Sequence, residues 1–168
     1  MFNRLQLQDI INNALKEDLG SDGIDITTDS LISDSDKACA IISTRSNCVV
    51  SGVEVVKQVF MTLDSNLKFE CFCKDGDRKT IGSKLLQIKG SASSILKAER
   101  TALNLFQRMC GISTQTSSFC KASKRPDLLI LDTRKTTPGL RIIERLAVST
   151  GGGINHRMGL YDAIMIKD

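Results

Sequence analysis

Two short apolar runs, each ending abruptly in charge, most constrain how this 168-residue chain can fold. The first run covers residues 128–131 and is followed by Asp132, and the second covers residues 163–166 and is followed by Lys167. Continuous apolar runs of this length are typical of parallel strands that are buried on both faces. The runs begin 35 residues apart, which suits one strand–helix–strand unit of about 30 residues or more. This part of the chain therefore predicts an α/β architecture with a parallel sheet.

The first 90 residues combine helical and strand patterns, which predicts an α+β fold with an antiparallel sheet and helices on one side. Apolar residues recur at helical spacing over residues 7–15 and 53–63, and Gly20 is placed to end the first helix. Residues 18–36 are polar and are expected to form a loop. Strands are expected at residues 38–43, 48–51, 67–73 and 85–89.

A long helix is expected after this sheet, over residues 94–109. Ser93 or Ser94 can cap its N-terminus, because a serine side chain accepts hydrogen bonds from the first free N–H groups of a helix. Gly111 is expected to end this helix, and residues 112–122 are expected to form another.

Charge is unevenly distributed along the chain. Residues 1–36 hold two basic and eight acidic residues, a balance of −6, and the net charge of the chain is +4, so the remainder carries +10. Such a basic segment suits either a nucleic-acid surface or a site for small, heavily charged anions. The chain has no run of Lys and Arg and only six Phe and one Tyr, so stacking on bases is poorly supported. We therefore favour small anions and expect no nucleic-acid partner.

Several other classes of protein are disfavoured by composition. The six cysteines form no Cys-x-x-Cys pair and His156 is the one histidine, so a zinc site is not expected and the thiols are expected to be reduced. No apolar run approaches the roughly 18 residues of a transmembrane helix, and no signal-peptide core follows Met1. We expect a cytoplasmic protein that does not bind a membrane.

Basic side chains at the ends of the two expected strands are the first candidate site. The carboxyl ends of strands are where α/β proteins bind ligands, so Arg134, Lys135 and Lys167 are expected to converge there. Residues 133–137 also pair basic side chains with hydroxyls just before a helix that Pro138 is expected to open, a combination that suits phosphate or carboxylate. The alternative is that these charges only mark where each strand reaches solvent.

Two further segments carry candidate residues. The glycine triplet 151–153 has a backbone that can approach a ligand closely, and His156 and Arg157 follow it. The alternative is a flexible linker with an exposed histidine. Arg100 lies within the long expected helix, where a solvated charge is the simpler interpretation.

Taken together, these segments resemble the quinolinate phosphoribosyltransferase family. The substrate loop of that family is similar to DTRKTTPGLR at residues 132–141, and its linking helix is similar to ERTALN at 99–104 followed by GIST at 111–114. The resemblance covers essentially the whole chain, and several motifs occur in the family's order. The other matching segments are EDLG at 17–20, DITT at 25–28, DGD at 75–77, GGGINHR at 151–157 and IKD at 166–168.

The resemblance implies the reaction of quinolinate with phosphoribosyl pyrophosphate to give nicotinate mononucleotide, pyrophosphate and carbon dioxide, with Mg²⁺. It also implies an N-terminal α/β sandwich domain (residues 1–108, with the linking helix) and an open α/β barrel, here incomplete, that begins at residues 109–168. The family works as a homodimer or larger oligomer.

The resemblance also implies roles for individual residues. Arg134, His156 and Arg157 would contact the quinolinate carboxylates, and Arg100 would reach into the site of the partner subunit. Thr133 belongs to the same substrate loop. Lys135 and Lys167 would contact quinolinate or the phosphoribosyl phosphates and take part in catalysis.

Two departures from the family pattern leave alternatives open. Arg145 and Leu146 replace the usual Lys-Tyr pair, so Arg145 is a further possible site residue. A barrel of this kind takes roughly 250 residues, whereas residues 109–168 supply 60, so we expect the chain to hold about two barrel units and no residues for the metal. It could then be a fragment of an active enzyme, an inactive remnant that acts only as an interaction module, or a paralogue that uses another carboxylate acceptor.

Overall fold

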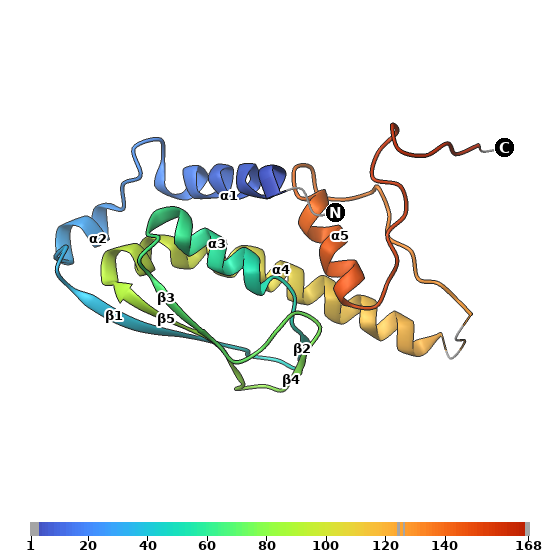
Figure 1. The fold of residues 1–168 in the computed structure, drawn as a ribbon, viewed down its shortest axis with the longest axis horizontal. Helices are drawn as coiled ribbons and strands as arrows, with labels where there is room; N and C mark the ends of the chain where they lie inside the picture. The colour runs from blue at the N-terminus through green and yellow to red at the C-terminus, as the bar shows by residue number, and fades with distance from the viewer. Residues whose placement is uncertain (1–3, 124, 126, 167–168) are drawn as a thin grey trace.

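The computed structural model describes residues 4–123, 125 and 127–166 and shows a mixed α/β fold (Figure 1). The expected mixture of helices and strands is confirmed. In chain order the elements are α1 (Arg4–Leu19), α2 (Ile26–Leu31), β1 (Lys37–Ser43), β2 (Cys48–Val49), α3 (Val53–Leu63), β3 (Lys68–Cys71), β4 (Arg78–Lys79), β5 (Lys84–Ser91), α4 (Ala92–Ala122) and α5 (Arg141–Thr150).

The N-terminal part is a layered sandwich of one sheet and three helices. Strand β5 lies between β1 and β3 and pairs antiparallel with both. Helices α3 and α4 cover one face of this sheet, and α1 lies across the two helices on the side away from the sheet (Figure 1). The core is apolar side chains from all these elements, among them Ile11, Phe60 and Ile88, which are almost fully buried. The antiparallel sheet with helices on one side is confirmed.

A small second sheet packs against α4. Strand β2 pairs antiparallel with β4. The Ser113 hydroxyl on α4 donates to the Val49 carbonyl (2.6 Å), and the Val49 N–H donates to the Thr114 hydroxyl (2.9 Å). Both contacts satisfy backbone groups that a two-residue strand leaves unpaired.

The prediction that residues 18–36 form only a loop was wrong, because α2 lies within them. The Asp25 carboxylate caps this helix by accepting hydrogen bonds from the N–H groups of Thr27 and Thr28, both at 3.1 Å. These bonds replace the partners that the first N–H groups of a helix lack.

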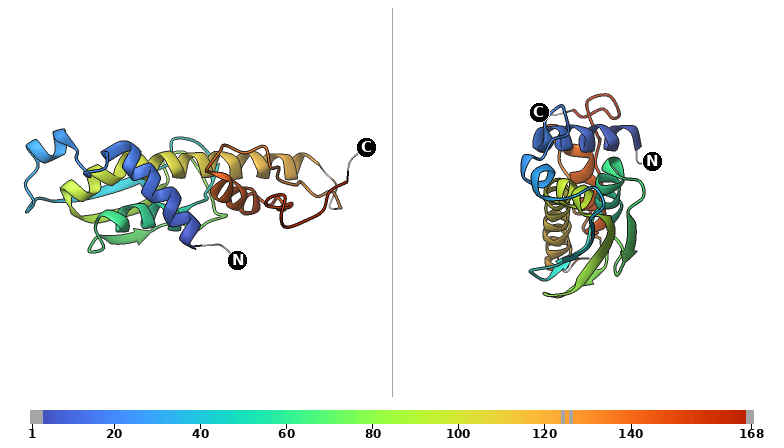
Figure 2. Two further views of the ribbon diagram at one scale, coloured as in Figure 1. Left: turned by 90° about the horizontal axis from the view of Figure 1, so that it is seen from above. Right: turned by 90° about the vertical axis from the view of Figure 1, so that its left-hand side faces the viewer.

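The prediction that Gly111 ends a helix was also wrong. Helix α4 runs for 31 residues from its cap at Ser91, which accepts a hydrogen bond from the Ser94 N–H, to Ala122. It extends along the long axis of the molecule (left view of Figure 2). Tertiary contacts on both sides of Gly111 bury Met109, Cys110 and Ser113, which holds the glycine in the helix. The domain division between residues 108 and 109 falls inside this helix and stays a prediction.

The two apolar runs do not form the expected parallel strands. Residues 128–131 and 163–166 lie outside any strand, and Leu129, Ile164 and Ile166 are 60%, 93% and 91% exposed. A parallel strand buried on both faces needs hydrogen-bonded neighbours and covering helices, and the described residues supply the first run with little more than one parallel bridge, between Leu131 and Ile154. The helix expected to open at Pro138 begins at Arg141.

Candidate active site

Two loops leave the same end of the parallel bridge. The Ile154 N–H donates to the Ile130 carbonyl (2.8 Å), and the Asp132 N–H donates to the Ile154 carbonyl (3.0 Å). Because the two segments run in the same direction, the residues that follow each of them emerge side by side. The structure therefore places the loop that holds Arg134 and Lys135 beside the segment that holds His156 and Arg157. The second segment is residues 154–157 and not the expected run at 163–166.

Asp132 joins the two loops. One oxygen of its carboxylate accepts the His156 N–H (2.8 Å), and the other lies 3.2 Å from the Arg145 guanidinium. With its amide nitrogen facing the carboxylate, Asn155 donates to the second oxygen as well (2.9 Å). The Asp132 side chain is 3% exposed. A carboxylate this buried needs such partners, and this cluster fixes the start of the loop at residues 132–141 against residues 155–157.

Two arginines one turn apart on α5 contact the same loops. Arg145 donates to the carbonyls of His156 (2.6 Å) and Arg157 (2.9 Å). Arg141 donates to the carbonyl of Arg134 (3.2 Å) and to that of Met158 (3.1 Å). Arg141 also donates to the Thr136 hydroxyl (3.0 Å).

The linking helix α4 is connected to this site by a further ion pair. Arg108 on α4 donates through Nε to Glu144 on α5 (2.9 Å), whose side chain is 11% exposed. The same guanidinium donates to the hydroxyl of Thr137 in the loop at residues 132–141. The Arg108 side chain therefore connects α4 both to α5 and to the loop.

The glycine triplet 151–153 packs against α4. A Cβ atom at Gly151 would overlap the Ser113 carbonyl oxygen, and one at Gly153 would lie 2.9 Å from the Thr116 side chain and 3.1 Å from the Ile130 carbonyl oxygen. These glycines are therefore needed for close approach of the chain to α4 and to the first bridged segment. The structure supports neither a flexible linker nor an open ligand cradle at the triplet itself.

The predicted substrate-binding side chains of the loops are mostly open to solvent. Thr133, Arg134, Lys135 and His156 are exposed, and the Thr133 hydroxyl accepts the Lys135 N–H (3.1 Å). The His156 Nδ1 atom accepts the Arg157 N–H (2.6 Å). A neutral ring must then carry its proton on Nε2, where it can donate to an incoming carboxylate.

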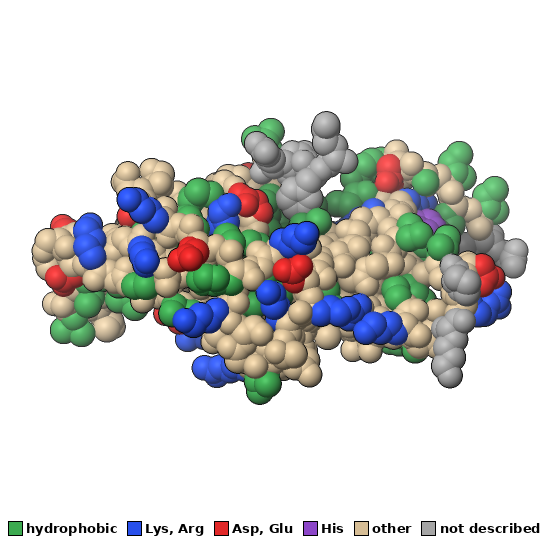
Figure 3. Space-filling model, turned by 60° about the horizontal axis from the view of Figure 1, so that its bottom comes forward, with side chains coloured by type: hydrophobic (Ala, Val, Ile, Leu, Met, Phe, Trp, Pro, Cys, Tyr) green, Lys and Arg blue, Asp and Glu red, His purple; other side chains and the backbone are tan. Residues whose placement is uncertain are grey.

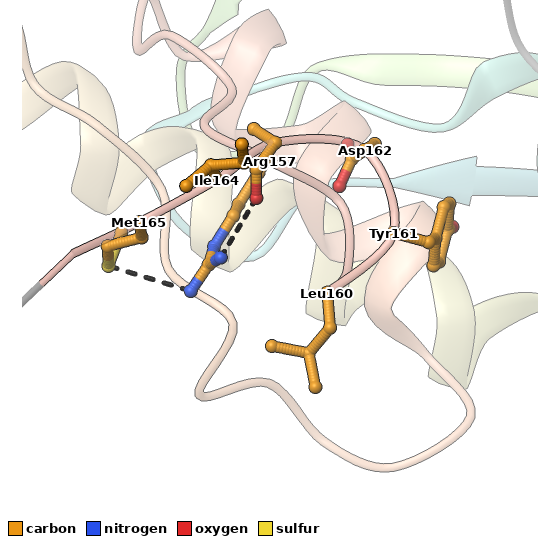
Figure 4. Close-up of a pocket in the computed structure, with 7 residues that line it drawn as sticks. Arg157, Leu160, Tyr161, Asp162, Ile164 and Met165 are labelled. Carbon is orange, nitrogen blue, oxygen red and sulfur yellow. Dashed lines mark hydrogen bonds between the residues drawn. The ribbon is translucent and has the colours of Figure 1, made fainter.

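Arg157 lines an open pocket of about 490 Å³ with residues 160–165 (Figure 4). Its guanidinium donates to the Ala163 carbonyl (3.0 Å) and lies 3.5 Å from the Met165 sulfur. Its Nε is buried and has no hydrogen-bond partner among the described residues. Asp162 accepts the N–H groups of Gly159 (2.9 Å) and Met158 (2.6 Å), and these bonds hold the pKa of that carboxyl below its usual range.

The remaining predicted site residues lie elsewhere. Arg100 is exposed on α4, eight residues before Arg108, or about 12 Å along the helix axis at 1.5 Å per residue. It is therefore not gathered with the loop residues of its own chain. Arg145 is 12% exposed and is held by Asp132 and the two carbonyls. Lys167 lies outside the described residues.

The described residues give few signs of other kinds of site. Among them, no group of three or more His, Cys, Asp or Glu residues could hold a metal ion. No helix in the described part of the chain has both the length and the apolar content to cross a membrane. Figure 3 shows Lys and Arg side chains scattered along one face of the molecule and not gathered into one patch.

Family models match two consecutive parts of the chain. The N-terminal domain of quinolinate phosphoribosyl transferase matches residues 25–110, and the C-terminal domain of the same enzyme matches residues 112–168. The chain belongs to the quinolinate phosphoribosyltransferase family. The family resemblance of the sequence motifs is therefore confirmed.

Individual relatives agree with this assignment. The chain is 40% identical to a probable nicotinate-nucleotide pyrophosphorylase (carboxylating) of Bacillus subtilis over 99% of this chain and 57% of that relative. It is 41% identical to a quinolinate phosphoribosyltransferase (decarboxylating) of Nicotiana tabacum over 96% of this chain and 45% of that relative. The crystal structure of NadC from Streptococcus pyogenes superposes with a TM-score of 0.95 at 38% identity and covers 100% of this chain and 59% of that one. The chain thus spans about half the length of the relatives it matches.

Sequence reasoning missed the residues that hold the site together. The sequence pattern places Asp132 where a strand ends, and it assigns no role to Asn155, Arg108 or Glu144 beyond their segments. The spacing of Arg141 and Arg145, four residues apart on a predicted helix, was a usable signal, because such residues lie on one face.

Proposed function

We propose that the protein transfers a phosphoribosyl group from phosphoribosyl pyrophosphate to quinolinate with decarboxylation, which yields nicotinate mononucleotide, pyrophosphate and carbon dioxide. The observation that carries this proposal is the joining of two cationic loops at one end of the Leu131–Ile154 bridge. Asp132 fixes one loop to the other through the His156 N–H (2.8 Å). The relatives' names, which include quinolinate phosphoribosyltransferase, support the same reaction.

The two carboxylates of quinolinate explain why cations come from both loops. Arg134 is exposed, and its planar guanidinium can bind one carboxylate through two parallel hydrogen bonds, which an ammonium cannot do. His156 can donate from Nε2, because its Nδ1 already accepts the Arg157 N–H. Arg157 lines the open pocket that it forms with residues 160–165. These three groups are proposed to bind and orient the acid.

The reaction needs charge stabilisation more than a protein nucleophile. Departure of pyrophosphate leaves an oxocarbenium-like ribose carbon, which the pyridine nitrogen attacks. The carboxylate on the carbon next to the cationic ring nitrogen then leaves as carbon dioxide. The electron pair of the broken bond stays on that carbon, where the adjacent positive nitrogen stabilises it, and the carbon takes up a proton. Rate would come from positioning and from preorganised positive charge, for which Lys135 in the substrate loop and Lys167 are the proposed catalytic groups, with Thr133 as a further contact.

A role for Mg²⁺ and a cytoplasmic location both stay predictions. The described residues do not form a set of carboxylates that fits the metal, so we derive no step through it. Mg²⁺ usually keeps several waters and binds through substrate phosphates, which is how we expect it to enter with phosphoribosyl pyrophosphate.

Arg100 is proposed to act in the site of a partner subunit in a homodimer. It is exposed on α4 and about 12 Å along the helix from Arg108, which itself contacts the substrate loop. The test mixes two variants, Arg100→Ala and Arg134→Ala, at a quinolinate concentration low enough that neither has much activity alone. If Arg100 acts across the interface, hybrid dimers contain one intact site and about a quarter of parental activity returns, whereas no recovery on mixing would assign Arg100 to its own subunit.

The proposed reaction is tested on the protein as its gene encodes it, with quinolinate, phosphoribosyl pyrophosphate and Mg²⁺. Carbon dioxide and nicotinate mononucleotide should form in equal amounts and only when phosphoribosyl pyrophosphate is present. Nicotinate, which lacks the second carboxylate, should not serve as an acceptor. Turnover of nicotinate would indicate a paralogue with another acceptor, and absence of any turnover would favour an inactive interaction module.

A further inference from the structure

We propose that Arg141 and Arg145 are positioning residues that set the spacing of the quinolinate-binding side chains by holding the backbone from which those side chains project. This inference rests on the proposed function for its ligand. The two arginines lie four residues apart on α5, so both project from one face of the helix.

The carbonyls that the two guanidinium groups hold belong to the proposed binding residues themselves. Arg141 donates to the carbonyl of Arg134 (3.2 Å). Arg145 donates to the carbonyls of His156 (2.6 Å) and Arg157 (2.9 Å). A single helix thus determines where the backbone of all three residues lies. A guanidinium is suited to this task because its donors form a rigid planar fork.

The same contacts place both arginines outside direct substrate binding. Arg145 is 12% exposed and lies 3.2 Å from the Asp132 carboxylate, which balances its charge. Its guanidinium is therefore already engaged with Asp132 and the two carbonyls, which leaves little of it for a substrate carboxylate. Arg141 is likewise committed, through all three of its nitrogens, to Thr136, Met158 and Arg134. The positive charge that faces the ligand is left to the exposed side chains.

The inference explains the replacement at position 145. A lysine, which the resemblance leads one to expect there, keeps the ion pair with Asp132 but can direct its ammonium at fewer acceptors. The arginine holds two successive carbonyls at once. Both residues would therefore support the site, with the arginine giving the more rigid loop.

The experiment compares four variants of this chain with the parent: Arg141→Ala, Arg145→Ala, Arg145→Lys and, as control, Arg125→Ala. Among the described residues, the Arg125 side chain bonds to Asp127 two residues away and to no other, on an exposed segment. Hydrogen–deuterium exchange of residues 154–158 and quinolinate affinity by calorimetry are measured for each. If Arg145→Ala fails to fold, Arg141→Ala still tests the inference. Arg141 donates to neutral acceptors, so its removal leaves no buried carboxylate unpaired.

Both alanine variants should weaken quinolinate binding by about tenfold or more, since misplacement of about 1 Å can cost on the order of 10²-fold. Exchange at residues 154–158 should rise by about tenfold in Arg145→Ala, while strand β5 exchanges as in the parent. Arg145→Lys should recover much of both losses, and Arg125→Ala should match the parent. Parental affinity and exchange in both alanine variants would overturn the inference. If the parent itself fails to bind quinolinate, the proposed function fails, and the exchange data alone decide the positioning role.

Discussion

The structure determines whether the replacement of Gly111 by alanine raises or lowers the free energy of unfolding. Gly111 lies in the interior of α4, it is exposed, and a Cβ atom added there would meet nothing within 4 Å beyond the backbone of the helix itself. Alanine is about 1 kcal/mol more favourable than glycine at such a position, because glycine loses more backbone freedom on folding. Gly111→Ala should therefore stabilise the protein by about 1 kcal/mol.

The prediction from sequence, that Gly111 ends a helix, implies instead that alanine destabilises the protein. If Gly111 ended a helix in the left-handed conformation, alanine would cost roughly 1–2 kcal/mol. Urea unfolding followed by circular dichroism separates the two cases: with a slope of about 2 kcal/mol per molar, stabilisation moves the midpoint up by about 0.5 M. A midpoint that falls, with an unchanged slope, would refute the continuous α4.

Further predictions concern packing, the joined loops and a buried thiol. Gly151→Ala should destabilise by about 1–3 kcal/mol in the same urea assay, because its Cβ would overlap the Ser113 carbonyl; stability at or above that of the parent would contradict the close packing. Asp132→Ala should destabilise by about 3–5 kcal/mol, measured in the same way, because it leaves the nearly buried Arg145 without its carboxylate; a loss within 0.5 kcal/mol, about the size of an ordinary surface substitution, would contradict this. Burial raises the pKa of the Cys110 thiol to about 12, so at pH 8 iodoacetamide should label the exposed Cys39 well before Cys110, as mass spectrometry of timed samples would show; equal rates would place Cys110 at the surface.

Periodicity was a good guide where each element can bury its own apolar face. Helices α1 and α3 were predicted from side-chain spacing, and buried residues such as Ile11 and Val59 are among those that the spacing selected. Of the strands of the main sheet, β3 was predicted from the alternation over residues 67–73. The short helix α2 was missed although Asp25 precedes it as a cap. A six-residue helix has too few turns to produce a periodic signal.

The second part of the chain could not be predicted as well, because its secondary structure depends on contacts with segments distant in the sequence. The apolar run at residues 128–131 has the composition of a buried strand, but it forms one bridge, to Ile154, and Leu129 stays 60% exposed. The continuity of α4 through Gly111 is likewise set by contacts on both sides of the glycine and not by the glycine itself.

The sequence predicted the cationic side chains of the candidate site but not the residues that hold its loops in place. Arg134, Lys135, His156 and Arg157 were named from motifs, and the structure gathers their loops. The groups that fix those loops, above all Asp132 with its 3% exposed side chain, act through hydrogen bonds to backbone atoms. The contacts of Asp132 leave no pattern in a single sequence, whereas the spacing of Arg141 and Arg145 does.

The measurement that tests the central claim most directly is a calorimetric titration of quinolinate into this chain and its Arg134→Ala variant. Because Arg134 is exposed, we expect the loss of a charge-assisted hydrogen bond worth about 1.5–3 kcal/mol, which corresponds to weakening on the order of tenfold to a hundredfold. Nicotinate should bind the parent chain more weakly than quinolinate does. Equal affinity of the parent and the variant for quinolinate would contradict the assignment of these loops as the quinolinate site.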